Sequence, residues 1–274
     1  MGTSSSFGGP KGKSPLLPPW AQDVDSDSED NNDTGSDQPI ESEADSQENE
    51  IFGDYSSAKR SLSRFINDRP GYTIKSASKS YVRSLGGAKN ASRSSSSGKR
   101  AVASFGGFLG NVAKQGVEQA LTDLGLQDLI GETSEVVFAG IVDAIAPNGS
   151  TNEEADARQA IIDTLDKLYD KFELEDNINK LDSLSEADIK EAVLDSVKAY
   201  IYERWLQELS LCIEKNSLTP SDAIRKEADI KEHIKSSVEY DFEDYDVLNM
   251  DFTQGDGKNL IESIFQEAYQ TLES

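Results

Sequence analysis

The sequence has little of the residue types that most often carry chemistry. It holds one cysteine, Cys212, and one histidine, His233, in 274 residues. A single cysteine excludes an internal disulfide and is typical of a reducing compartment. A structural zinc site takes four Cys or His ligands, so this chain cannot supply one. Cys212 follows apolar residues and is expected to be buried, whereas His233 lies among charged residues and is expected to be exposed.

These two residues do not predict a catalytic pair, because such a pair also needs an orienting third group and a set of hydrogen-bond donors. The many carboxylates of the chain lie in helical, solvated patterns that single out no pair for acid–base chemistry. We therefore expect a protein that is not an enzyme and that carries no metal and no cofactor.

Long apolar runs are also missing. No uncharged apolar stretch reaches the roughly 18 residues that a membrane span needs. The longest candidate, residues 101–113, contains three glycines. The N-terminus lacks the basic and apolar regions of a secretory signal. These absences favour a cytoplasmic protein with no membrane partner.

Charge, by contrast, is abundant and strongly divided along the chain. The formal net charge is −24, and the mean hydropathy is −0.57. Thirteen acids and no base lie from Asp23 to Asp54, whereas twelve bases and only Asp68 lie from Lys59 to Lys114. From Gln115 onward there are 37 acids and 13 bases. Adjacent acidic and basic runs can associate with each other or bind separate partners.

Composition predicts a chain of four segments. They are a Gly- and Pro-rich peptide over residues 1–20, an acidic disordered tether over 21–55, a basic Ser-rich segment of low order over 56–100, and an acidic all-helical domain over 101–274. Within the third segment, short elements are expected around Ala58–Asn67 and Ala77–Leu85, and the run Ser92–Arg100 is expected to be a linker.

From Ala101 onward the pattern predicts an all-α domain. Apolar residues recur at helical spacing, and no segment alternates as a strand does. Three helix starts are predicted from a capping residue with an acid three positions later: Thr151 with Glu154, Ser185 with Asp188, and Thr219 with Asp222 after Pro220. A last helix is predicted over 258–272.

The N-terminal peptide combines flexibility-promoting residues with apolar ones. Glycine and proline at this density exclude a helix. Apolar residues that a plain linker would not need nevertheless occur at Phe7, Leu16, Leu17 and Trp20. An extended peptide with apolar anchors is the form that docks into another protein's groove. The alternative, a loose terminus with incidental hydrophobic residues, stays open.

Two further segments allow different partners. The basic segment interleaves aromatic residues with Lys and Arg, as proteins that bind single strands do. The acidic segments on both sides would repel a phosphate backbone, so nucleic acid as a partner stays open. The acid- and aromatic-rich stretch Tyr240–Phe252 could mimic a nucleic acid, but isolated apolar residues usually pack, which favours a connection that buries its aromatics.

The opening block MGTSSSFGGPKGKSPLLPPWA resembles the N-terminus of the QatB family, a component of bacterial Qat anti-phage defence systems. The run FGGFLGNVAKQGVEQALTDLGL at 105–126 and the string NEEADARQAI are also similar to that family. The resemblance implies companion proteins: an ATPase, a QueC-like enzyme and a TatD-like nuclease. QueC chemistry uses ATP to activate a carboxylate on a deazapurine for attack by an amine.

Beside such an enzyme, the N-terminus gains a role. Removal of Met1 would expose the α-amino group of Gly2, for which a pKa of about 7.7–8.0 is usual. The resemblance therefore implies that Gly2 is a modification acceptor for the QueC-like enzyme. The residues expected to dock onto that partner are Phe7, Leu16, Leu17, Pro18, Pro19 and Trp20. Two alternatives stay open: a nucleic-acid-binding or DNA-mimicking adaptor for the nuclease, and a plain scaffold.

Overall fold

The computed structural model describes residues 55–175, 177–243 and 245–274, and every regular element in these ranges is a helix. The all-α fold class is therefore confirmed. Contacts along the chain divide it into residues 1–49 and 50–274, and all the described residues belong to the second unit. The peptide expected over 1–20 lies outside the described residues, as does the tether expected over 21–55 except for its last residue.

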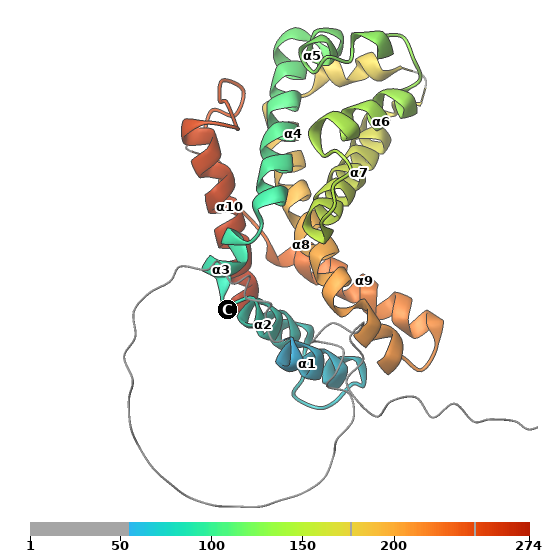
Figure 1. The fold of residues 1–274 in the computed structure, drawn as a ribbon, viewed down its shortest axis with the longest axis vertical. Coiled ribbons are helices and arrows are strands. Elements are labelled where there is room, and N and C mark those ends of the chain that lie inside the picture. The colour runs from blue at the N-terminus through green and yellow to red at the C-terminus, as the bar shows by residue number, and fades with distance from the viewer. Residues whose placement is uncertain (1–54, 176, 244) are drawn as a thin grey trace, which may run out of the picture. The chain divides into compact units, whose positions relative to one another are not determined.

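Four long helices form the body of this unit. They are α4 (Ser96–Gln115), α7 (Asn152–Phe172), α8 (Glu186–Asn216) and α10 (Gly255–Glu273). Helices α4, α7 and α8 contact one another along their lengths, and α10 packs against α4 and α8 (Figure 1). Large side chains are fully buried in its interior, among them Phe105, Leu165, Tyr200 and Phe265. Burial of this apolar surface is the main term that stabilises the bundle.

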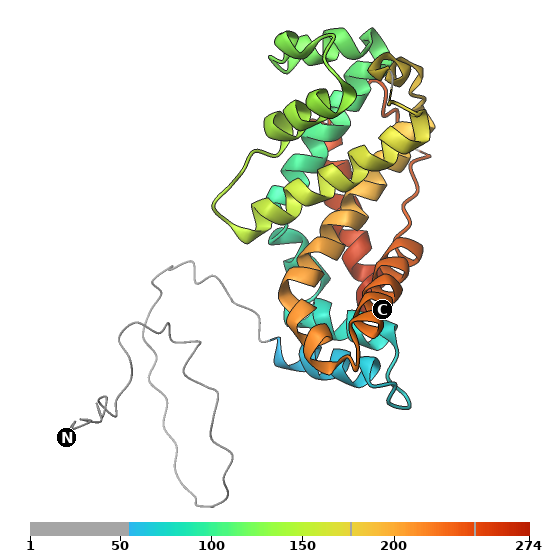
Figure 2. The same ribbon diagram turned by 90° about the vertical axis from the view of Figure 1, so that its right-hand side faces the viewer.

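Shorter helices cover the two ends of the body (Figures 1 and 2). At one end lie α1 (Ser56–Ile66), α2 (Ile74–Ser84) and α3 (Ala88–Arg93), with α9 (Pro220–Ser237) folded back on α8. At the other end lie α5 (Val117–Asp123), η2 (Gln127–Leu129), α6 (Ser134–Ile145) and η3 (Ile178–Ser183). Helix α4 therefore links the two ends.

The predicted helix starts are confirmed by side-chain caps. Thr151 and Ser185 each accept a hydrogen bond from the backbone N–H three residues on, and the acids there bond back, which completes two capping boxes. Thr219 caps α9 ahead of Pro220. The last helix begins at Gly255, three residues before the predicted start.

The linker expected over Ser92–Arg100 is wrong. Residues 88–93 form α3, and α4 begins at Ser96. The small side chains that suggested a linker instead allow close packing: Ser95 is fully buried, and Gly98 faces the ring of Tyr200. A Cβ atom placed on Gly98 would lie 2.6 Å from that ring.

The basic segment expected to have low order is also helical. Helices α1 and α2 correspond closely to the short elements expected there, and their apolar faces are buried through Leu62 and Tyr81. They pack on α8, α9 and α10 and so belong to the same folded unit as the rest of the helices. The boundary expected between residues 100 and 101 falls inside α4 and does not divide two segments of different order. Charge composition hid this packing because the bases occupy the outer faces of amphipathic helices.

The stretch Tyr240–Phe252 connects α9 to α10, as its favoured interpretation predicted. Phe242, Val247 and Phe252 are buried, and Tyr240 packs edge-on against Phe242. The aromatic rings therefore face the interior and are not displayed for a partner.

Candidate interaction surfaces

The residues predicted to accept a modification and to dock onto a partner all lie outside the described residues. They are Gly2, Phe7, Leu16, Leu17, Pro18, Pro19 and Trp20. The described part of the chain instead presents charged surfaces at the two ends of the body, together with a buried polar network that holds α3, α4 and α8 together.

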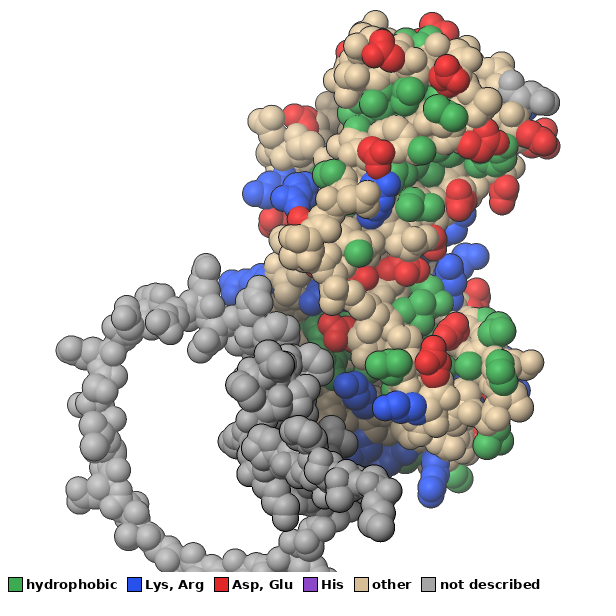
Figure 3. Space-filling view, turned by 45° about the vertical axis from the view of Figure 1, so that its right-hand side comes forward, with side chains coloured by type: hydrophobic (Ala, Val, Ile, Leu, Met, Phe, Trp, Pro, Cys, Tyr) green, Lys and Arg blue, Asp and Glu red, His purple; other side chains and the backbone are tan. Residues whose placement is uncertain are grey.

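The first of these surfaces is a basic end, formed by α1, α2 and α3. It carries nine bases and one acid, Asp68. The bases are Lys59, Arg60, Arg64, Arg69, Lys75, Lys79, Arg83, Lys89 and Arg93. None of them forms a salt bridge with a side-chain carboxylate of the described residues. On the face shown in Figure 3, several Lys and Arg side chains gather on the lower part of the body.

Asp68, the acid of this end, already forms a salt bridge with Lys226. Its carboxylate accepts a hydrogen bond from Lys226 Nζ at 2.8 Å, and the Lys226 side chain is buried with its Nζ 4.4 Å from the centre of the Phe65 ring. This hydrogen bond and the charge of Lys226 lower the pKa of Asp68. The negative charge therefore offsets Lys226 from α9 rather than the bases of α1 and α2.

A hollow of about 420 Å³ opens at the turn between α1 and α2. It is lined by Ser63, Arg64, Asn67, Arg69 and Tyr72. The Arg64 guanidinium donates a hydrogen bond to the Tyr72 hydroxyl and lies 4.8 Å from the centre of its ring. Two guanidinium groups, an amide and two hydroxyls in one hollow can hold the oxygens of an anion.

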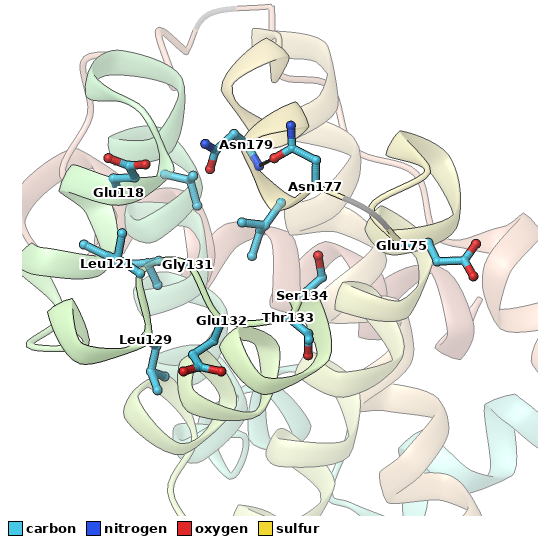
Figure 4. A pocket seen from close by; sticks show the side chains of 13 residues that line it. Glu118, Leu121, Leu129, Gly131, Glu132, Thr133, Ser134, Glu175, Asn177 and Asn179 are labelled. Carbon is cyan, nitrogen blue, oxygen red and sulfur yellow. Dashed lines mark hydrogen bonds between the residues drawn. The ribbon is translucent and has the colours of Figure 1, made fainter.

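The opposite end of the body is acidic. Residues 115–145, which form α5, η2 and α6 there, contain six acids and no base. A cavity of about 350 Å³ lies there between α5, the start of α6 and η3 (Figure 4). Glu118 and Glu132 lie at its rim, whereas Glu175 points away from both. Within the described ranges, no three His, Cys, Asp or Glu side chains are placed to hold a metal ion.

Buried polar groups connect the basic end to the body. The Arg204 guanidinium of α8 donates to the hydroxyls of Ser94 at 2.9 Å and Ser95 at 3.0 Å, and the Ser95 hydroxyl is 3.1 Å from that of Tyr269. Glu153 accepts from the backbone N–H of Ser97 at 2.7 Å. These bonds fix the junction of α3 and α4 against α7, α8 and α10.

Removing the Tyr269 hydroxyl tests this network. Tyr269→Phe should lower the free energy of unfolding by about 1 kcal/mol, because it deletes a buried hydrogen bond and leaves the ring in place. Chemical denaturation monitored by circular dichroism measures the change. No loss of stability would show that the hydroxyl is not bonded to Ser95.

Two carboxyls between α7 and α8 have perturbed titration. Burial raises the pKa of Asp156 to about 7, with further contributions from the negative charges of Glu203 and Glu208, while Arg204 opposes the rise. The Asp156 Oδ2 atom is buried and has no hydrogen-bond partner among the described residues. Burial raises the pKa of Glu203 to about 6. Burial disfavours the charged form of a carboxyl, so the two groups keep their protons to a higher pH than exposed carboxyls do.

The thiol and the imidazole have separate local partners. The Cys212 Sγ atom donates to the Lys59 carbonyl oxygen at 3.4 Å, and His233 Nδ1 is 3.2 Å from the Ser237 hydroxyl. Both residues are half-buried, so Cys212 is less buried than expected. The expected exposure of His233 is wrong, because α9 packs against α2 and α8. Burial raises the pKa of the Cys212 thiol and lowers that of His233.

A helical domain with oppositely charged ends and hydrogen-bonded connections between its helices has the features of a protein that binds partners. None of the helices in the described part of the chain is long and apolar enough to cross a membrane.

Comparison with protein families agrees with this class. The family model QatB, described as Qat anti-phage system associated protein QatB, matches residues 86–272, which is more than half of the chain. The chain therefore belongs to the QatB family of anti-phage system components, as the resemblance predicted. The match begins between α2 and α3, so it leaves out α1 and α2. No curated protein and no solved structure matches the sequence.

Proposed function

We propose that this chain is a non-catalytic component of a Qat system that binds the QueC-like enzyme and is modified by it at the α-amino group of Gly2. The observation that carries the proposal is the family match, because it associates the chain with the Qat anti-phage system. The opening block that resembles the family N-terminus adds the position of the modification.

The chemistry suits glycine at this position. An α-amino group has a pKa of about 7.7–8.0, so a fair fraction is unprotonated and nucleophilic at neutral pH. Glycine has no side chain to hinder attack on an activated carboxylate. The small residues Thr3, Ser4, Ser5 and Ser6 that follow would let the strand enter a narrow pocket. Leu16, Leu17 and Trp20 would anchor it outside, with Pro18 and Pro19 favouring an extended backbone.

The helical domain would then act as the docking body of a substrate. The ATPase and the TatD-like nuclease are proposed as further partners, and the cytoplasm as the location of the complex. In this arrangement the catalytic groups belong to the QueC-like enzyme, and the QatB-family chain supplies the amine and the recognition surface.

Intact mass spectrometry tests the proposal. The full chain is coexpressed with the active QueC-like enzyme and, separately, with an inactive form of it. We expect an added mass that maps to Gly2 only with the active enzyme. An unmodified N-terminus in the presence of a stable complex with the active enzyme would contradict the acceptor role and leave a scaffold.

Two variants separate chemistry from docking. Gly2→Glu retains Met1, because a bulky second residue blocks its removal, so the Gly2 adduct should vanish while the complex persists. Replacing Leu16, Leu17 and Trp20 by alanine should weaken the complex as well. If the complex survives both changes with unchanged affinity, the N-terminal peptide is not the docking element.

A further inference from the structure

We infer that the basic end formed by α1, α2 and α3 is a binding surface for single-stranded nucleic acid, with the hollow between α1 and α2 as a phosphate site. The inference goes beyond the proposed conjugation and does not depend on it. It rests on the charge, exposure and packing of residues 55–93.

The first step concerns available positive charge. Nine bases lie on this end, and no side-chain carboxylate of the described residues pairs with them. Elsewhere the ion pairs are numerous: Lys167, Lys171 and Lys190, for example, each bind a carboxylate. Asp68 is neutralised by Lys226 of α9.

Lys79 donates to the Ser274 backbone oxygen at 2.8 Å and Arg64 to the Tyr72 hydroxyl, but none of the nine is neutralised by a side-chain carboxylate. These positive charges are therefore available to neutralise phosphates and release their counterions.

The second step concerns the hollow. Arg64 and Arg69 both line it, and the Arg69 side chain has no hydrogen-bond partner among the described residues. The hollow is fixed from behind, because Ser63 Oγ donates to Asn216 Oδ1 at 2.6 Å and Asn67 Nδ2 donates to the Ser63 carbonyl at 2.8 Å. Guanidinium groups in a fixed frame suit phosphate oxygens.

The third step concerns the class of ligand. The large hydrophobic residues with substantial exposure are Tyr72, Ile130, Val136, Leu211, Leu218 and Ile224, and of these only Tyr72 lies in α1–α3 or their turns. Leu211, Leu218 and Ile224 lie in the neighbouring α8–α9 hairpin, but the hollow between α1 and α2 is lined by no aliphatic residue, so it does not suit a lipid surface. A surface that binds nucleic acid needs Lys or Arg side chains and polar groups for the phosphates. For a single strand it also needs an exposed aromatic ring on which a nucleobase stacks. Tyr72 at the rim of the hollow supplies that ring.

The fourth step concerns the net negative charge of the chain, which would be expected to repel a phosphate backbone. The acidic end begins beyond α4, whose residues Ser96–Gln115 span roughly 30 Å at 1.5 Å per residue. At physiological salt, interactions between exposed charges are largely screened beyond about 8 Å. A strand on the basic end therefore experiences mainly the nearby charges, despite the total of −24. These are the nine bases, Asp68 and carboxylates from other helices such as Glu273, which accepts from the Ala88 backbone N–H at 2.9 Å.

Fluorescence anisotropy of the full chain with a labelled oligodeoxythymidine of about 20 nucleotides tests the inference. We expect binding that weakens as salt rises, with a slope of about −0.7 for each phosphate contact. Arg64→Gln with Arg69→Gln should weaken binding at least 10-fold and make the slope less steep. Tyr72→Ala alone should weaken binding about 5-fold or more, because it removes a stacking platform.

The matched control is Lys167→Gln with Lys190→Gln, which removes the same charge from α7 and α8. It should change the affinity less than about 2-fold, and circular dichroism checks that both double variants are folded. Equal losses in the two double variants would overturn the inference. Polyglutamate is added so that its carboxylates match the concentration of the oligonucleotide's phosphates. Displacement of the oligonucleotide under these conditions would also overturn the inference and assign the surface to acidic proteins. Tighter binding of a duplex than of the single strand would overturn the stacking role of Tyr72.

Discussion

Replacing Gly98 by alanine should lower the free energy of unfolding by about 1–3 kcal/mol. Alanine is the better helix former by about 1 kcal/mol, so an open helical position would gain stability. At Gly98, however, the added Cβ atom would lie 2.6 Å from the Tyr200 ring. Tyr200 is fully buried and packs edge-on against Phe265, so the ring cannot move without displacing α10. Such overpacking costs more than the gain in propensity.

Gly107→Ala is the matched control in the same helix. No atom lies within 4 Å of a Cβ placed on Gly107, so this change should stabilise the protein by about 0.5–1 kcal/mol. Urea denaturation of both variants measures the difference. Stabilisation by both changes would mean that the start of α4 does not pack on α8, and no effect at Gly98 would restore the linker interpretation of Ser92–Arg100.

This pair of glycines also shows where prediction from sequence failed. The helix starts at Thr151, Ser185 and Thr219 could be predicted because a cap is a local hydrogen bond between residues close in sequence. The packing of Ser95 and Gly98 could not, because a small residue is informative only when its neighbour across the bundle is known. Serine and glycine are typical of linkers and of close helix contacts alike.

Asp156→Asn should stabilise the protein at pH 8 by about 2 kcal/mol and have little effect near pH 4. The folded state holds the Asp156 proton up to a pKa of about 7, whereas the usual value of 3.8 applies when the chain is unfolded. The unfolded state releases the proton first, so stability falls as pH rises from about 4 to 7. Each difference of one in pKa corresponds to about 1.4 kcal/mol, and partial screening by water reduces the total.

Thermal and urea unfolding between pH 4 and pH 8.5 measure this effect. Asparagine keeps the size of the side chain and removes the charge, so the stability of the variant should depend less on pH. Glu203, whose pKa is also raised by burial, should leave a residual dependence. Asp170→Asn on the exposed surface of α7 is the control for loss of the same charge. A variant that is less stable than the wild type at pH 8 would show that the Asp156 carboxylate is bound there.

The candidate surfaces were only partly accessible from the sequence. The division of charge along the chain could be counted, and it located the basic segment correctly. That its bases stand on packed helices, with Asp68 bonded to Lys226, depended on a contact between residues 158 positions apart. Tyr72 could have been singled out by its position between Arg69 and Lys75 in a Pro-Gly turn, but its exposure follows from the tertiary fold.

The position of α1 has a mechanical consequence. Helix α1 is short, comes first among the described helices and packs mainly on α2 and α8, so it should open at a lower free energy than the body unfolds. Opening residues 56–73 would release up to roughly 60 Å of extended chain. Whatever holds the preceding residues could then move away from the bundle, or pull on it, before the interior is disturbed. Helix α1 would unfold under tension, which lengthens the chain, and would refold when the tension is removed.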